Sequence, residues 1–103
     1  MDGLAPAAVI GVSAVSAFGV GWRGLGQALL ERRLTPRASE QLARSHPGTP
    51  ASEVPAIAAA DEVADAKARR LMSRAAHLAA VAMKKALDDA GWGDGRQEIG
   101  CYL

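Results

Sequence analysis

The side chains that could act as nucleophiles, bases or metal ligands are few and scattered in this sequence. Cys101 is the only cysteine, and it lies in an apolar run beside Tyr102, without the neighbouring base or helix start that would make a thiol reactive. His46 lies in a stretch rich in Pro and Ser, and His77 lies in a helical one; neither has a metal-ligand or Ser/Asp partner at a recognisable spacing. We therefore expect Cys101 to be a buried structural thiol and both histidines to be surface or hydrogen-bonded core residues.

The carboxylates near the end of the sequence do not make a defined acid/base pair. They are Asp88, Asp89, Asp94 and Glu98. Carboxylates close to a helix end and a turn are usually solvated. The sequence accordingly predicts no catalytic residue, no metal ligand, no cofactor-binding residue and no cofactor.

A Gly-rich segment at positions 19–24 has the G-x-G-x-x-G spacing that cradles a dinucleotide pyrophosphate between a strand and a helix. A dinucleotide-binding unit also needs a second parallel strand that ends in an acidic residue about 20 positions later. The region around Glu40 is polar and flanked by Pro, and Trp22 would crowd a turn that must approach a phosphate. A Gly-rich turn from strand to helix is the simpler interpretation, and a nucleotide-binding α/β domain is the third-ranked function.

A group of cations is the clearest sign of molecular recognition. It comprises Lys67, Arg69, Arg70 and Arg74. These residues fall at the expected start of a long helix, where the helix dipole is itself positive and disfavours cations. The conflict favours an anionic partner, and a solvated basic face is the alternative interpretation.

The composition limits the size of the hydrophobic core and the classes of partner that the chain could bind. The chain has 103 residues, of which 50% are hydrophobic but only 4% aromatic, so it offers one small domain with little apolar area per residue. A net charge of +1 provides no overall field for nucleic acid or membrane. The uncharged run over 3–22 follows Asp2 instead of a basic flank and is interrupted by Gly, Ala and Ser, unlike a signal peptide or a membrane span. With its single cysteine, the sequence predicts a cytoplasmic protein that binds neither nucleic acid nor membrane.

Hydrophobic patterning predicts the order strand, helix, loop, long helix, strand. Residues 7–15 are apolar on both alternating faces and rich in β-branched residues, which is typical of a buried parallel strand. Residues 22–33 have the spacing of an amphipathic helix. The Pro-rich segment 34–61 is expected to be a loop with at most one short strand near 52–57.

Helical regularity returns after Asp61 or Asp65, and the second half of the chain predicts a long helix whose apolar residues line one side from Met72 to Ala90. Its apolar residues spread well beyond one stripe, so we expect it to be nearly all buried apart from its charged and histidine side chains. These exceptions are Arg74, His77, Lys84, Lys85, Asp88 and Asp89. Ser73 either caps this helix or lies within it, and Gly91 stands where a left-handed residue would end it. A turn at 92–96 and a second apolar strand at 99–103 would follow, and the pattern is then cut off within a sheet.

Four segments in this order resemble β-ketoacyl synthases. Residues 9–19 (VIGVSAVSAFG) resemble the opening strand and turn, V-x-x-T-G-x-G-x-x-S-x-x-G, and residues 22–33 resemble the W-x-x-L-x-x-G helix that follows. Residues 68–91, which begin ARRLMSR and end ALDDAG, are similar to the R-x-M…A-L-x-D-A-G helix. Residues 99–103 (IGCYL) look like the strand that runs into the family's G-T/S-G turn.

The resemblance has two local departures and one large one. Ile10 stands where Thr is usual, and Ser13 stands where the second Gly is usual. The family's nucleophilic Cys lies at a strand-to-helix elbow beyond this point, and its two His residues belong to the second half of the fold. No residue of this chain occupies any of those positions.

The resemblance implies that residues 1–103 are the N-terminal portion of a thiolase-like layered α/β fold, incomplete on its own. The family's reaction is decarboxylative Claisen condensation of acyl thioesters in fatty acid or polyketide biosynthesis. The implied partners are acyl carrier protein and either a second ketosynthase-like chain or a missing C-terminal portion that supplies Cys and His. Lys67, Arg69 and Arg70 form the implied carrier-protein docking site, with Lys67 and Arg70 on matching positions. The alternative is a non-catalytic interaction subunit of a ketosynthase-like complex.

Overall fold

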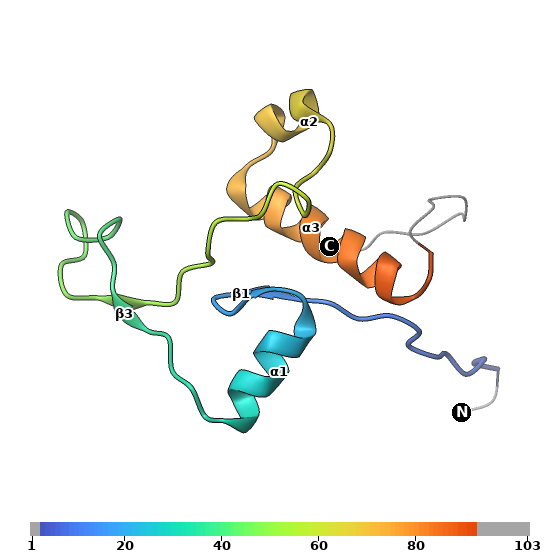
Figure 1. Ribbon diagram of the computed structural model, residues 1–103. Coiled ribbons are helices and arrows are strands. Elements are labelled where there is room, and N and C mark those ends of the chain that lie inside the picture. The colour runs from blue at the N-terminus through green and yellow to red at the C-terminus, as the bar shows by residue number, and fades with distance from the viewer. Residues whose placement is uncertain (1–2, 93–103) are drawn as a thin grey trace.

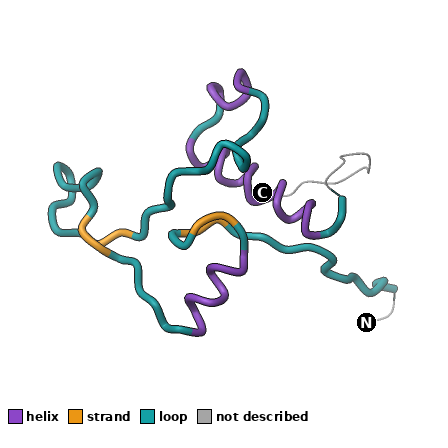
Figure 2. The backbone as a smooth tube through the Cα atoms, viewed as in Figure 1, coloured by secondary structure: helices purple, strands orange, loops and turns teal. Residues whose placement is uncertain are grey.

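Helices and short hairpin-like pairings make up the regular structure of the computed structural model, which describes residues 3–92 (Figure 1). The described residues form a small mixed α/β arrangement with three helices and two two-stranded sheets (Figure 2). In chain order the elements are β1 (Val15–Ser16), β2 (Gly19–Val20), α1 (Trp22–Leu30), β3 (Arg37–Ala38), β4 (Pro50–Ala51), α2 (Ala66–Leu71) and α3 (Arg74–Asp89).

The first sheet is an antiparallel hairpin of β1 and β2. Val15 pairs with Val20 and Ser16 pairs with Gly19, whose φ of 104° suits a residue without a side chain. The expected buried parallel strand at 7–15 is therefore wrong over most of its length: only Val15 belongs to a strand, and Val9 is 88% exposed. A buried strand needs neighbours on its edges and cover on both faces, and the described residues do not provide both.

Helix α1 starts at Trp22 as expected but ends at Leu30 instead of Arg33. The chain turns back because Arg32 adopts a left-handed conformation with a φ of 55°, and the Arg33 N–H donates to the Ala28 carbonyl at 2.9 Å. Ala28 is the buried residue of this helix, whereas Leu29 is 69% exposed. The amphipathic pattern thus places the helix correctly, but the described residues do not cover its apolar face.

The Pro-rich segment 34–61 is mostly loop, as predicted. The expectation of at most one short strand near 52–57 is wrong, because the segment holds two: β4 at Pro50–Ala51, before the expected position, pairs antiparallel with β3 at Arg37–Ala38. Pro55 interrupts the expected strand because it has no N–H to donate to a ladder. A hydrogen bond of 2.8 Å from Thr35 Oγ1 to Ser52 Oγ closes the loop just beyond the pairing.

The expected long helix is divided between α2 and α3. Met72 is extended (ψ 138°) and ends α2, and Ser73 caps α3 by accepting a hydrogen bond of 3.1 Å from the Ala76 N–H. At the other end Gly91 has a φ of 77°, as predicted, and the Trp92 N–H donates to the Leu87 carbonyl at 2.8 Å. This is a Schellman C-terminus, and a serine cap and a glycine cap therefore define α3.

Figure 1 shows the β1–β2 hairpin between α1 on one side and α3 on the other. The segment before β1 packs closely on α3 at Gly11, and the Val12 N–H donates to Asp89 Oδ2 at 3.0 Å. Ala28 and Val81 are the buried hydrophobic residues of the described part, so the expectation that the long helix is nearly all buried is wrong. The Cα radius of gyration is 16.9 Å, against about 13 Å for a closed domain of 100 residues.

The remaining predictions concern a membrane span and the end of the chain. None of the helices within 3–92 combines the length and the apolar character needed to cross a bilayer. The expected strand at 99–103, and the expected turn apart from Trp92, lie outside the described residues.

Candidate functional site

Helix α2 carries the cations that the sequence singles out, and its own start is well capped. Asp65 Oδ1 accepts hydrogen bonds from the N–H groups of Lys67 at 2.9 Å and Ala68 at 3.2 Å. Arg69 and Arg70 lie in the last turn of this six-residue helix. Cations are favourable at that end of the dipole, so the predicted conflict with the start of a long helix is wrong for Arg69 and Arg70. It remains for Lys67, in the first turn of α2, and for Arg74, the first residue of α3.

The inner face of α2 is held by Arg69. Its Nη1 donates to the Val63 carbonyl at 2.5 Å, and its Nε lies 3.6 Å from Glu62 Oε2. Arg69 and Ala68 are half-buried. Arg69 therefore anchors the preceding turn, and its guanidinium is committed to partners within the chain.

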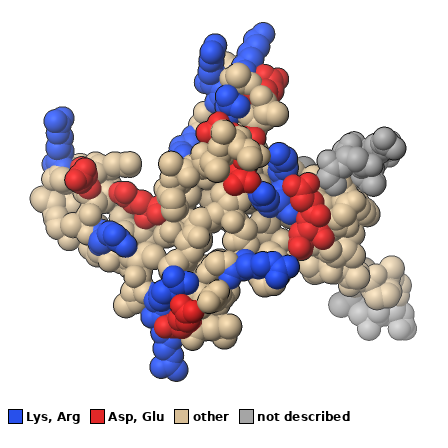
Figure 3. Space-filling model, in the orientation of Figure 1, with Lys and Arg blue, Asp and Glu red and all other residues tan. Residues whose placement is uncertain are grey.

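The opposite side of α2 is the outer face, which we define as Lys67, Arg70 and Leu71. These residues are related by i, i+3 and i+4 spacing, which places them on one side of a helix. All are exposed, Leu71 by 81%. Neither Lys67 nor Arg70 belongs to an ion pair within residues 3–92. Figure 3 shows Lys and Arg side chains projecting from the end of the molecule that carries α2.

The Gly-rich turn borders a cavity of about 400 Å³ between the start of α1 and the last turns of α3. Asp88 and Asp89 line this cavity, and Lys85, which also lines it, is paired with Asp61 at 2.7 Å. A phosphate would meet these carboxylates, and the turn follows an antiparallel hairpin instead of a parallel strand. A Cβ at position 24 would lie 3.3 Å from the Phe18 carbonyl oxygen, so close packing accounts for Gly24.

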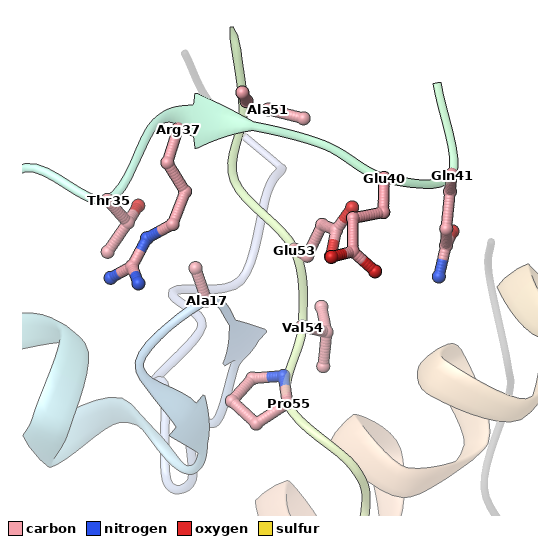
Figure 4. Close-up of a pocket in the computed structure, with 10 residues that line it drawn as sticks. Ala17, Thr35, Arg37, Glu40, Gln41, Ala51, Glu53, Val54 and Pro55 are labelled. Carbon is pink, nitrogen blue, oxygen red and sulfur yellow. The ribbon is translucent and has the colours of Figure 1, made fainter. Parts of the chain in front are cut away.

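A larger cavity of about 520 Å³ lies between the β3–β4 pair and the β1–β2 turn (Figure 4). Arg37, Glu40 and Glu53 line it, and Glu53 accepts a hydrogen bond from Ser39, which is 7% exposed. Neither Cys nor His is among the lining residues. The cavity therefore has charged walls and offers neither a thiol nor an imidazole.

The histidines do not form a site in the described structure. His46 is exposed, with its Nδ1 2.9 Å from Ser45 Oγ. His77 is half-buried, and its Nε2 has no hydrogen-bond partner within the described part, so the expected hydrogen-bonded histidine is not found there. No group of three His, Cys, Asp or Glu side chains within residues 3–92 could hold a metal ion.

Of the remaining candidate residues, the thiol and the four carboxylates, some lie within the described residues and some lie outside them. Asp88 and Asp89 both border the cavity of about 400 Å³, and Asp89 also accepts a hydrogen bond from the Val12 N–H, which is a structural contact. Cys101, Asp94 and Glu98 lie outside the described residues.

The best-defined ionic contact supports the fold. Lys85 Nζ lies 2.7 Å from Asp61 Oδ1 and joins the end of the Pro-rich loop to α3. The hydrogen bond to Asp61 and its negative charge raise the pKa of Lys85; burial opposes this shift, and the negative charge of Asp88 adds to it. The ammonium is therefore fixed in its charged form.

Comparisons with protein-family models, with curated proteins and with solved structures return no match to this chain. The resemblance to β-ketoacyl synthases accordingly consists of the four sequence segments and their order. The structure adds one residue that the sequence does not single out, Leu71, whose exposure depends on the break between α2 and α3.

Proposed function

We propose that this chain is the N-terminal part, or a subunit, of a β-ketoacyl-ACP synthase-type condensing enzyme in fatty acid or polyketide biosynthesis. The catalytic Cys and His residues lie outside this chain. The observation that carries the proposal is the ordered set of four segments that resemble the family. The chain's own contribution is structural support and recognition of the carrier protein.

The unfinished core supports an assembly with further polypeptide. Val9 is 88% exposed and Ile10 is 56% exposed, in an extended segment that α3 contacts at Gly11. Burying a Val or Ile side chain is worth about 1.5–3 kcal/mol, so covering this segment would be strongly favourable. A second layer of protein over 7–12 would complete a strand of the kind that the sequence pattern predicts.

The reaction determines which groups this chain must receive from another polypeptide or a C-terminal portion. Condensation requires a Cys thiolate that accepts the acyl group and two His residues that polarise the thioester carbonyl. Neither of the two cavities described above, of about 520 Å³ and about 400 Å³, has Cys or His among its lining residues. Another polypeptide or a C-terminal portion supplies the reacting groups, and this chain presents the α2 outer face to the substrate carrier.

Activity in the presence and absence of the missing groups tests the proposal. The chain would be purified alone and together with a ketosynthase fragment that lacks the corresponding N-terminal region but carries the Cys elbow and both His residues. We expect acyl transfer from acyl carrier protein only in the mixture, with loss of activity when the fragment's Cys is replaced by Ala. Turnover by the chain alone contradicts the proposal, as does failure of the two polypeptides to associate.

Charge reversal tests the docking site separately. Lys67→Glu with Arg70→Glu should weaken binding of acyl carrier protein by more than about tenfold at low salt, where exposed charges act most strongly. The matched control is Lys84→Glu with Arg44→Glu, which changes the net charge equally at two exposed positions elsewhere. Equal affinities of the two variants would remove Lys67 and Arg70 from the docking site.

The alternative proposal is a non-catalytic interaction subunit. The same exposed apolar residues favour it, because they require a partner whether or not that partner is an enzyme. Copurification separates the two proposals. A partner with a Cys-centred elbow and two downstream His residues supports the condensing enzyme, and a partner without them supports the interaction subunit.

A further inference from the structure

We propose that Leu71 is the apolar centre of the carrier-docking surface and determines how long the partner stays bound, whereas Lys67 and Arg70 determine how fast it arrives. The inference rests on the proposed function and deepens it. The partner that fits is an acidic helix with one apolar side chain exposed among its carboxylates.

The local fold forces Leu71 outward. Asp65 fixes the start of α2 through the N–H groups of Lys67 and Ala68, and Arg69 ties the inner face to the Val63 carbonyl. Turning the helix to bury Leu71 would break these contacts. The extended Met72 and the Ser73 cap prevent α2 from continuing into α3, so Leu71 remains 81% exposed in the last turn.

The neighbours of Leu71 select the charge of the partner. Lys67 lies one helical turn before it and Arg70 directly precedes it, both exposed and outside the ion pairs of residues 3–92. Arg74 follows at the start of α3 and is also exposed. Asp65, the nearest acidic residue in sequence, directs its carboxylate to backbone N–H groups. A leucine with cations around it is complementary to an apolar side chain with carboxylates around it.

The two kinds of residue should act on different binding parameters. Exposed charges accelerate encounter, and salt screens them because the Debye length falls from about 10 Å at 0.1 M to about 3 Å at 1 M. A desolvated apolar contact at the centre of an interface acts mainly on dissociation. Loss of Leu71 should therefore weaken binding at every salt concentration, unlike loss of the cations.

The experiment measures association and dissociation rates of the full chain with two probes at low and high salt. The first probe is acyl carrier protein, and the second is a synthetic acidic helical peptide with one central Leu. Leu71→Ser should raise the dissociation rate by about tenfold at both salt concentrations. Leu71→Met should restore tight binding, and Leu34→Ser, at a position that is 90% exposed, should have no effect.

A double-mutant cycle defines the contact. Replacing the peptide's Leu by Ser should weaken binding to the wild-type chain but add little to Leu71→Ser, because the two side chains meet. Full additivity would overturn the inference, as would equal dissociation rates for Leu71→Ser and Leu34→Ser. Far-ultraviolet circular dichroism of each variant should match that of the wild type, since both leucines are exposed.

The two probes distinguish the inference from the proposed function. Binding of carrier protein that depends on Lys67 and Arg70 but not on Leu71 overturns the inference and leaves the proposed function intact. Binding of the peptide that depends on Leu71, without binding of carrier protein, supports the surface and contradicts its assignment to a condensing enzyme. Absence of binding to either probe overturns both.

Discussion

Gly11 decides how closely the N-terminal segment can approach α3. A Cβ at this position would lie 2.7 Å from the Ala90 Cβ and 2.9 Å from the Ala90 N, and it would also collide with the Ala86 carbonyl oxygen. Backbone atoms of a helix cannot move aside cheaply. Gly11→Ala should therefore lower the free energy of unfolding by about 1–3 kcal/mol, measured by denaturant titration followed by circular dichroism.

Gly26 supplies the matched control for this prediction. It lies inside α1, and a Cβ there meets only the Trp22 ring, at 3.9 Å. Gly26→Ala should raise the free energy of unfolding by about 0.5–1 kcal/mol, because Ala loses less conformational freedom in a helix. Effects of the same sign in the two variants would contradict the close packing of Gly11 on α3.

Single residues with a strong local preference were predictable from sequence. Gly91 was expected to end α3 and does so with a φ of 77°, and Ser73 was one of two alternatives for the cap. The exposure of Leu71 was not predictable, because a continuous helix would have placed it on an apolar side. Local conformation determines a cap, whereas exposure depends on the direction in which a whole helix faces.

The start of α3 depends on the hydrogen bond of 3.1 Å from the Ala76 N–H to Ser73 Oγ. Ser73→Ala should lower the free energy of unfolding by about 1 kcal/mol and reduce the protection of the Ala76 amide from hydrogen exchange. Ser73→Thr retains the hydroxyl and should preserve both properties. Full protection of the amide in Ser73→Ala would mean that α3 does not depend on this cap.

The ion pair of Lys85 and Asp61 gives the link between the Pro-rich loop and α3 a defined pH dependence. The hydrogen bond and the negative charge of Asp61 raise the pKa of Lys85 in the folded chain. The stabilisation is therefore complete below the unfolded lysine pKa of about 10.4, and it is lost as the pH rises through the higher folded value.

Lys85→Met should remove this alkaline loss, which amounts to at most about 1 kcal/mol because the lysine side chain is 37% exposed. The measurement is the denaturation midpoint between about pH 7 and about pH 11.5, a range that spans the unfolded lysine pKa. The control is Lys84→Met, because Lys84 is exposed and has no ion-pair partner within residues 3–92. Identical pH profiles for the two variants would show that the pair does not stabilise the fold.

At the scale of elements, helix positions were more predictable than strands. The expected helix at 22–33 loses only its last turn, since Arg32 takes a left-handed conformation. The expected strand at 7–15 is replaced by an extended segment that ends in a two-residue pairing. A helix makes its hydrogen bonds within itself, whereas a strand needs a neighbour, and periodicity does not reveal whether that neighbour is present.

At the scale of the whole molecule, the layers formed by residues 3–92 surround a core that these residues leave open. The β1–β2 hairpin separates α1 from α3, yet Ala28 and Val81 are the buried hydrophobic residues of the described part. The sparse aromatic content predicted a weak core, and the radius of gyration of 16.9 Å agrees with that prediction.

The extended segment 7–12 offers the most direct test of how the core is completed. Val9 is 88% exposed, so Val9→Asp should change the stability of the chain alone by less than about 0.5 kcal/mol. In the assembly it would place a carboxylate among apolar residues, which is costly without a partner charge. Copurification with the complementary ketosynthase fragment should therefore be lost, together with the protection of the 7–12 amides from hydrogen exchange.

Leu34→Asp is the control for this change, because Leu34 is 90% exposed and follows α1, away from the extended segment. It introduces the same charge and should leave copurification intact. If Val9→Asp assembles as well as Leu34→Asp, the segment is not the surface on which the fold is completed. The exposed residues of α1, among them Leu29 and Leu30, would then be the next apolar surface to test.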